Sequence, residues 1–161
     1  MDELLRLLQE NARYSNQELA HMLGSSEGDI KQRIQKLEDD GVILKFSAVI
    51  HPDKNTHLGG QVQAFIEVEV RPERDTGFDG IAERIYKFPE VKSCFLMSGG
   101  YDLLVLVEGK TLQDVAQFIS EKLSTIDHVK GTRTHFLLKR YKENGNLFTA
   151  KEKTERLAVS A

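Results

Sequence analysis

The spacing of apolar residues changes near residue 42, and this change limits the possible folds more than any other feature of the chain. Up to about residue 40, apolar side chains recur every three or four positions, as they do in amphipathic helices. From there on, segments with strand-like alternation are interleaved with further helical segments. We therefore predict an α+β protein with a helical domain at residues 1–50, a polar linker at 51–60, a mixed domain at 61–142 and a C-terminal tail at 143–161.

Capping signals divide the first forty residues into three short helices. Ser15-Asn-Gln-Glu18 has the pattern of a capping box, in which Ser15 caps the second helix and Glu18 reaches back. Gly24 is expected to end that helix, and Ser26 to cap the third, with Asp29 in the position of the capping-box acid. The stretch 42–50 (VILKFSAVI) is β-branched and aromatic, which indicates an extended wing. The predicted fold is a winged helix-turn-helix with buried stripes formed by Leu4, Leu5, Leu8, Ala12, Leu19, Ala20, Leu23, Ile30, Ile34 and Leu37.

The segments after the linker follow the order strand, helix, strand, strand, helix, strand. Residues 61–70 (QVQAFIEVEV) alternate with a period of two, and 91–97, 101–108 and 132–141 have the composition of three more strands. Helical spacing is shown by Phe78, Ile81, Ile85 and Phe88, and again by Leu112, Val115, Ile119 and Leu123. This order is that of the ferredoxin-like βαββαβ fold. We expect both helices to cover one face of the sheet.

The other face of the predicted sheet carries large apolar side chains where a monomer would place polar ones. These residues are Phe65, Leu104, Leu106 and Leu137. Large contiguous apolar patches are rare on the surface of monomers and usually mark an interaction site. A second copy packing sheet against sheet would cover the patch, so the pattern predicts a homodimer with these four residues in its interface.

Composition limits where the protein can act and which chemistry it can perform. The chain has 161 residues, no run of about 18 apolar residues and an acidic N-terminus unlike a signal peptide, so a cytoplasmic location without membrane contact is expected. Cys94, the single cysteine, is expected to be a small buried apolar residue. The five histidines show no ligand spacing, so neither a metal nor another cofactor is expected. No Ser/His/Asp arrangement supports catalysis. The net charge of −3 means that attraction to nucleic acid must come from a local patch.

The third predicted helix has the position of a DNA-contacting helix, although residues 1–50 carry nine Asp/Glu and only six Lys/Arg. At about 100° per residue, one face of that helix points away from the buried stripe and carries amide and lysine side chains. Glutamine can form two hydrogen bonds to adenine, and helix N-termini can bind phosphate. The alternative for the lysines is an ordinary solvated face. Candidate contacts to double-stranded DNA are Gly28, Lys31, Gln32, Gln35 and Lys36 for the groove, and Arg13, Asn16, Lys31, Arg33 and Lys45 for the phosphates.

Three segments resemble the Lrp/AsnC (feast/famine) family of transcription regulators, in collinear order over residues 1–145. They are LLRLLQENARYSNQELAHMLGSSEGDIKQRIQKLEDDGVI, LMSGGYDLLVLVEG and VKGTRTHFLLKRYKENG. The resemblance implies a winged helix-turn-helix joined to a ferredoxin-like domain that dimerises, often stacks dimers into octamers, and senses amino acids or related metabolites. It also assigns to the recognition-helix region Ser25, Ser26, Lys31, Gln32 and Arg33.

The resemblance further implies an effector site at the turn 98–102 (SGGYD), which matches the family's Gly-x-(Tyr/Phe)-Asp turn. Backbone amides at Gly99 and Gly100 could hold a ligand carboxylate, and Asp102 could bind its ammonium group. The alternative is a plain hairpin turn in which Asp102 bonds backbone and Tyr101 packs in the core or in an interface. The effector-site candidates are Ser98, Gly99, Gly100, Tyr101, Asp102, Thr132 and Thr134.

The expected function is that of a sequence-specific DNA-binding transcription regulator whose occupancy changes when an amino acid binds between subunits. One alternative is an enzyme resembling the sirohaem decarboxylases, which share this two-domain layout, although no clustered His/Arg motif for a tetrapyrrole is present. A second alternative, suggested by the acidic N-terminal half, is an effector-sensing scaffold with degenerate DNA binding.

Overall fold

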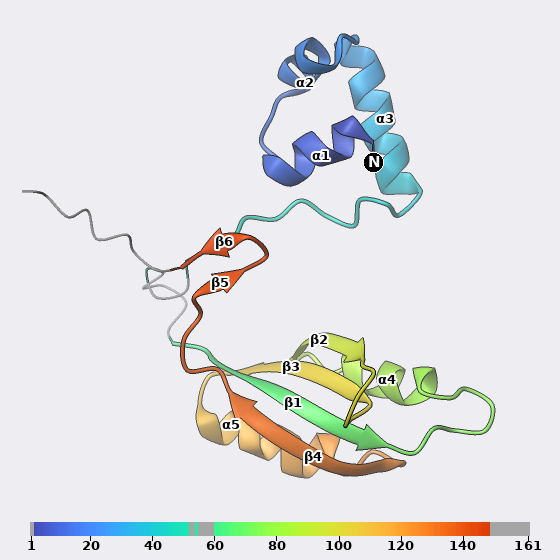
Figure 1. The fold of residues 1–161 in the computed structure, drawn as a ribbon, viewed down its shortest axis with the longest axis vertical. Helices are drawn as coiled ribbons and strands as arrows, with labels where there is room; N and C mark the ends of the chain where they lie inside the picture. Colours follow the sequence, from blue (N-terminus) through green and yellow to red (C-terminus); the bar gives the residue numbers. More distant parts are fainter. Residues whose placement is uncertain (1, 52–53, 55–59, 149–161) are drawn as a thin grey trace, which may run out of the picture. The chain divides into compact units, whose positions relative to one another are not determined.

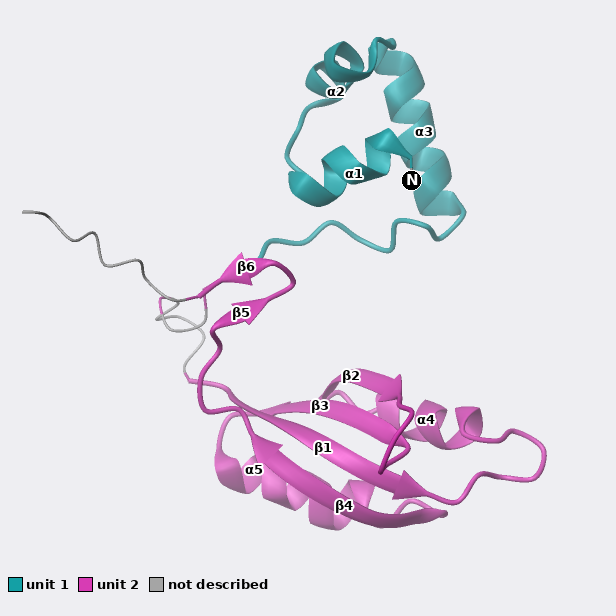
Figure 2. Ribbon diagram, in the orientation of Figure 1, with its two compact units in different colours: residues 1–50 teal, residues 51–161 magenta. Residues whose placement is uncertain are grey.

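The computed structural model describes residues 2–51, 54 and 60–148, which form two compact units (Figures 1 and 2). Unit 1 comprises residues 1–50 and unit 2 comprises residues 51–161. Unit 1 is helical and unit 2 combines an antiparallel sheet with helices, so the predicted α+β fold class is confirmed. The predicted tail beyond residue 148 and most of the predicted linker lie outside the described residues.

Unit 1 contains three helices whose ends follow the predicted capping signals. Helix α1 spans Glu3–Glu10, α2 spans Asn16–Leu23 and α3 spans Glu27–Asp39. Ser15 and Glu18 form the expected capping box, and Gly24 ends α2 with a positive φ of 63°. Leu7 is buried where Leu5 and Ala12 were expected, because position 7 shares a helix face with Leu4 and Leu8.

The predicted wing is not a strand within the described chain. Val42 and Ile43 both donate from their backbone nitrogens to the carbonyl of Leu37 at 2.9 Å, and the Ile43 side chain packs against the helical core. Residues 44–50 then continue without a ladder partner, and Leu44 is 89% exposed. A β-branched sequence favours an extended backbone, but a strand also needs a neighbouring strand to pair with.

Unit 2 is built on a four-stranded antiparallel sheet in the order β2-β3-β1-β4 (Figure 1). The strands are β1 (Val62–Val70), β2 (Val91–Leu96), β3 (Leu103–Gly109) and β4 (Val129–Phe136). Helix α4 (Asp79–Tyr86) connects β1 to β2, and α5 (Leu112–Gln117) leads into a π-helical segment, η2 (Phe118–Leu123), before β4. Both helices pack on the same face of the sheet, as predicted.

The period-two pattern of β1 places its apolar stripe in the core. Ala64, Ile66 and Val68 are fully buried between the two helices and the sheet. Cys94 projects to the same side from β2 and is half-buried against this core, where burial raises the pKa of its thiol. This core fixes which face of the sheet stays open, because neighbouring residues on a strand point to opposite faces.

The end of the chain differs from the prediction in two ways. The last long strand begins at Val129 and ends at Phe136, earlier at both ends than the predicted 132–141. A short hairpin then follows, with β5 (Lys142–Glu143) pairing with β6 (Asn146–Leu147). Its turn, Asn144-Gly145, has positive φ at both residues, 46° and 82°, as the tight turns favoured in hairpins require. The predicted C-terminal tail at 143–161 thus begins with part of a hairpin that the sequence analysis did not expect.

Candidate functional site

The loop between α2 and α3 is ordered by side-chain bonds to the start of α3. The Ser26 hydroxyl accepts a hydrogen bond from the Asp29 backbone N–H at 3.1 Å, as predicted for a cap. The Asp29 carboxylate instead accepts from the Ser25 hydroxyl at 2.7 Å, so it bonds the residue before the cap. The two helices and this loop form a helix-turn-helix with both serines fixed at the N-terminus of α3.

The outward face of α3 carries the side chains predicted to meet DNA bases. Gly28, Lys31, Gln32, Gln35 and Lys36 are all exposed, as the helical geometry required. The amide of Gln35 donates to Asp39 at 3.0 Å, one turn further along the helix. The groove-facing candidates therefore lie on one continuous face of α3, with its two lysines exposed to solvent.

The residues predicted to contact DNA phosphates differ in whether their side chains already pair with acids of unit 1. Arg33 pairs with Asp2 at 3.1 Å and lies 3.8 Å from Asp29, so two acids of its own unit compete for it. Arg13 is exposed at the loop before α2, and Asn16 is the first residue of that helix. Lys45 lies on the unpaired segment 44–50. Arg33 thus forms an ion pair with Asp2, and the sequence alone did not reveal this pair.

The turn predicted to bind an effector is closed by three hydrogen bonds. The Met97 N–H donates to the Asp102 carbonyl at 2.8 Å, and the Asp102 N–H donates to the Val68 carbonyl at 3.1 Å. The Asp102 carboxylate accepts from the Val70 N–H at 2.8 Å. Gly99 has a φ of 151°, which L side chains rarely adopt. The plain-turn alternative, in which Asp102 bonds backbone, is therefore observed.

Thr132 and Thr134 lie on β4, on the other side of β1 from the strand that follows the turn. They pair with Val68 and Ile66 across β4 and β1, and β1 separates β4 from the strand that follows the turn. Two strand spacings amount to roughly 10 Å. Asp102 itself bonds Val68 and Val70 of β1, so it and Thr132 lie on either side of the end of β1.

The open face of the sheet carries the predicted apolar patch. Phe65 pairs with Leu106, and Leu104 lies two residues along the same strand; all three are half-buried. Leu137 donates its backbone N–H to Gln63 at the edge of this face. The sequence analysis missed Phe95, which pairs with Leu104 and is 52% exposed. Its alternation with half-buried Cys94 is the signal that could have identified it.

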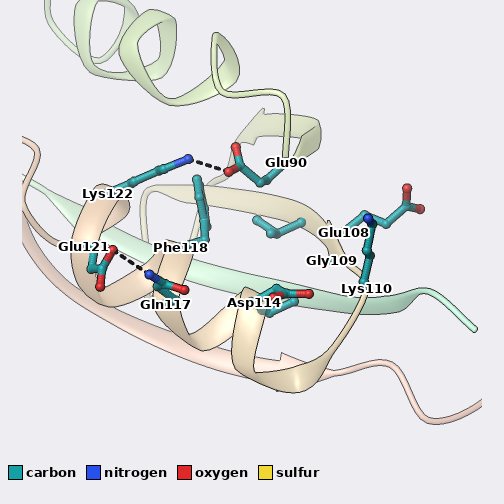
Figure 3. Close-up of a pocket in the computed structure, with 11 residues that line it drawn as sticks. Glu90, Glu108, Gly109, Lys110, Asp114, Gln117, Phe118, Glu121 and Lys122 are labelled. Carbon is teal, nitrogen blue, oxygen red and sulfur yellow. Dashed lines mark hydrogen bonds and ion pairs between the residues drawn. The ribbon is translucent and has the colours of Figure 1, made fainter.

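Unit 2 also contains an open pocket of about 450 Å³ at the opposite end of β3 from the turn (Figure 3). Lys122 reaches across it to Glu90 at 2.5 Å and holds the pKa of that carboxyl below its usual range. Gln117 donates to Glu121 at 3.0 Å on the same rim. The second carboxylate oxygen of Glu90 is buried and has no hydrogen-bond partner among the described residues. None of the effector-site candidates lines the pocket.

Over residues 2–51 and 60–148, no three His, Cys, Asp or Glu side chains gather as ligands for one metal ion. Among the helices in that part of the chain, none is both long enough and apolar enough to cross a bilayer.

Comparison with known families decides what kind of protein combines these two units. The Lrp/AsnC ligand binding domain matches residues 63–147, more than half of the chain, and a winged helix-turn-helix DNA-binding domain matches residues 3–43. The chain belongs to the Lrp/AsnC family of transcription regulators. This Lrp/AsnC regulator therefore has a DNA-binding domain and the family's ligand-binding domain, and the family consists of regulators rather than enzymes.

Individual relatives agree over almost the whole length. The uncharacterized HTH-type transcriptional regulator YugG of Bacillus subtilis is 46% identical over 98% of this Lrp/AsnC regulator and 95% of the relative. A transcriptional regulator of Neisseria meningitidis, solved with L-Met, is 31% identical with a TM-score of 0.70, covering 89% of this chain and 93% of that one. A feast or famine regulatory protein from M. tuberculosis, solved with L-methionine, is 25% identical with a TM-score of 0.69, covering 91% and 95%.

Proposed function

We propose that this Lrp/AsnC regulator binds an amino acid at the turn 98–102 and that this binding changes its occupancy of DNA. The observation that carries the proposal is the turn itself, in which Ser98, Gly99 and Gly100 are exposed and Asp102 is half-buried at one end of the sheet of a ligand-binding domain. Two structural relatives that hold L-methionine support an amino acid as the ligand class. The exposed amides at Gly99 and Gly100 suit its carboxylate, and Asp102 suits its ammonium group.

We infer that the complete effector site requires more than one subunit. Within one chain β1 lies between the strand that follows the turn and β4, which carries Thr132 and Thr134, and we propose that a neighbouring copy brings its own threonines to this turn. This arrangement would make ligand binding sensitive to assembly, because the ligand would bridge two copies. Linkage then requires that the ligand and the assembled state stabilise each other.

The apolar surfaces support self-association. Phe65, Leu104 and Leu106 form a contiguous patch on the open face, and residues 44–50 pair with no strand of the described chain. A second copy of the chain would cover the patch, and dimers could assemble further, up to an octamer. Two α3 helices held in one dimer could then contact two half-sites of one duplex.

DNA binding by a single unit 1 is proposed to be weak. Its nine acidic and six basic residues give no net attraction to a polyanion, and Arg33 is held by Asp2 and Asp29. Several units on one duplex raise the affinity through effective concentration. The Arg33 ion pairs also favour the second candidate function, an effector-sensing scaffold whose helix-turn-helix no longer binds DNA.

The test combines DNA binding with ligand addition on the full-length protein. We expect gel shifts on the DNA upstream of its own gene, and we expect at least one of the twenty L-amino acids to change the midpoint severalfold. Light scattering on the same samples should give a mass of two or more chains. Ligand binding by calorimetry without any gel shift would support the scaffold, and a monomer that binds no amino acid would contradict the proposal.

A further inference from the structure

We propose that His51 is a positioning residue that couples the two units, because its ring is bonded to Phe148 at the end of the C-terminal hairpin, which Arg140 links to β1. In this arrangement the tether to the DNA-binding unit begins at His51 rather than at the start of β1. The inference rests on the proposed function for its regulatory meaning, but the hairpin contact itself can be tested without DNA or ligand.

His51 is the first residue of unit 2 and directly follows Ile50, the last residue of unit 1. Its Nε2 lies 2.9 Å from the backbone carbonyl oxygen of Phe148, a residue 97 positions later, and must donate the hydrogen in this bond. The two rings also meet edge to face, with centroids 5.5 Å apart. Phe148 is only 9% exposed and is the one buried apolar residue described after β4. The end of the chain thus binds the beginning of unit 2.

The hairpin that presents Phe148 is linked to β1 of the sheet through Arg140. The Phe148 N–H donates to the Tyr141 carbonyl at 3.0 Å, which extends the β5-β6 pairing. The Arg140 guanidinium lies 5.5 Å from the centre of the Phe148 ring and pairs with Glu143 at 2.9 Å. Arg140 also donates to the side-chain oxygen of Gln63 on β1. We call His51, Phe148, Arg140 and Gln63 the hinge clamp.

The hinge clamp and the candidate effector turn lie at opposite ends of the same two strands. Gln63 stands near the start of β1 and donates to Glu108 on β3 at 2.8 Å. At the other end, Asp102 precedes β3 and bonds Val70, the last residue of β1. A shift of β1 against β3 caused by a ligand at the turn would therefore reach the hinge clamp through a continuous set of bonded residues.

The hinge clamp shortens the tether between the two units. Ile43 packs in the core of unit 1, so only residues 44–50 separate that core from His51. A fully extended chain of this length spans roughly 24 Å, whereas residues 44–61, the tether without the hinge clamp, would span roughly 60 Å. Adjacent half-sites on DNA lie about 34 Å apart. The state of the hinge clamp therefore decides which half-site separations a dimer can reach.

The His51 ring lowers the stability of the fold, because one of its nitrogens, Nδ1, is buried without a hydrogen-bond partner among the described residues. Buried nitrogens of this kind are uncommon and lower stability. An apolar residue would avoid this cost, so its presence supports a role in positioning the linker.

Limited proteolysis of the full-length protein tests the hinge clamp. Trypsin can cut after Lys54, three residues beyond His51, and after Lys45 in the segment 44–50, which serves as the internal reference. We expect His51→Ala to raise the cutting rate at Lys54 relative to Lys45 by about tenfold, because local opening becomes easier. Phe148→Ala should do the same, and His51→Gln should restore slow cutting, since its side-chain amide can donate in place of Nε2.

His135→Ala is the matched control, because this histidine of unit 2 contacts Glu67 rather than the hairpin. Unchanged cutting at Lys54 in both His51→Ala and Phe148→Ala would overturn the hinge clamp, as would an equal rise at both lysines, which indicates general destabilisation. With L-methionine as the probe, we expect His51→Ala to keep its ligand affinity and lose the ligand effect on DNA binding. A wild-type protein that binds neither DNA nor any amino acid of the panel would refute the proposed function, while the proteolysis would still decide the hinge clamp.

Discussion

The Asp102 carboxylate accepts a hydrogen bond from the backbone N–H of Val70 at 2.8 Å, so the candidate ligand-binding acid also ties the turn 98–102 to the end of β1. Val70 is buried, and losing this acceptor would leave its N–H without a partner. These two roles of Asp102 can be separated by mutation. Binding an ammonium group requires the negative charge, whereas holding the Val70 N–H requires only a hydrogen-bond acceptor. The same residue can thus serve both the plain turn and an effector site.

Replacing Asp102 tests this dual role. Asp102→Asn keeps an acceptor for Val70 and removes the charge, so we expect near-normal melting with at least tenfold weaker amino-acid binding by calorimetry. Asp102→Ala removes both and should also lower the free energy of unfolding by about 1–3 kcal/mol. Unchanged ligand affinity in Asp102→Asn would count against an ammonium-binding role.

A charge on the open sheet face should separate the subunits. Leu106 is half-buried opposite Phe65, and Leu106→Glu would place a carboxylate in the proposed interface. We expect light scattering to show a monomer at micromolar concentration. Leu138→Glu is the control, because Leu138 is 94% exposed in the single chain. If the Leu106 variant kept the wild-type mass, the interface would have to lie elsewhere.

Lysine and arginine on α3 should contribute unequally to DNA binding. Lys31 is exposed on the outward face, so Lys31→Ala should weaken binding on all sequences and lower the slope of log K against log salt by about 1. Arg33→Ala should have a smaller effect, because Arg33 is paired with Asp2. Lys87→Ala in unit 2 is the control, since Lys87 pairs with Glu83. Equal losses for Lys31 and Arg33 would contradict the assigned difference.

Acid should weaken the start of α2. The Ser15 backbone N–H and hydroxyl both donate to Glu18 and hold its pKa below the ordinary value of 4.5. A depressed carboxyl pKa stabilises the fold above the unfolded-state pKa, and that stability is lost as the pH falls through the folded-state pKa. Thermal melting should show the wild type more stable than Glu18→Gln at pH 7, with the difference shrinking towards pH 3. A pH-independent difference would exclude this linkage.

Local signals in the sequence were sufficient for much of the fold. The caps at Ser15, Ser26 and Gly24 involve residues within a few positions, and the alternation in β1 directly encodes its buried face. The Asn144-Gly145 turn was equally visible, between short segments able to pair, and was missed because no strong alternation flanks it. For these elements the physical cause lies inside the segment.

The remaining features depend on partners that are distant in the chain. His51 and Phe148 meet across 97 positions, and no short-range pattern links them. The pairing of Arg33 with Asp2 depends on how α1 packs beside α3. The prediction of a wing strand at 42–50 was wrong for a related reason. The composition favours an extended backbone, but a strand also needs a neighbouring strand with which to pair. The positions of Thr132 and Asp102 on either side of β1 likewise follow from the order of the strands in the sheet. The spacing of apolar residues along the sequence does not reveal that order.

The environment of Cys94 has a practical consequence. Burial raises the pKa of its thiol, so at neutral pH it stays protonated and should react slowly with maleimide dyes. A second cysteine introduced at an exposed position would therefore be labelled first in the otherwise native chain. Fluorophores attached in this way would report the separation between the two units in real time, as metabolites are added.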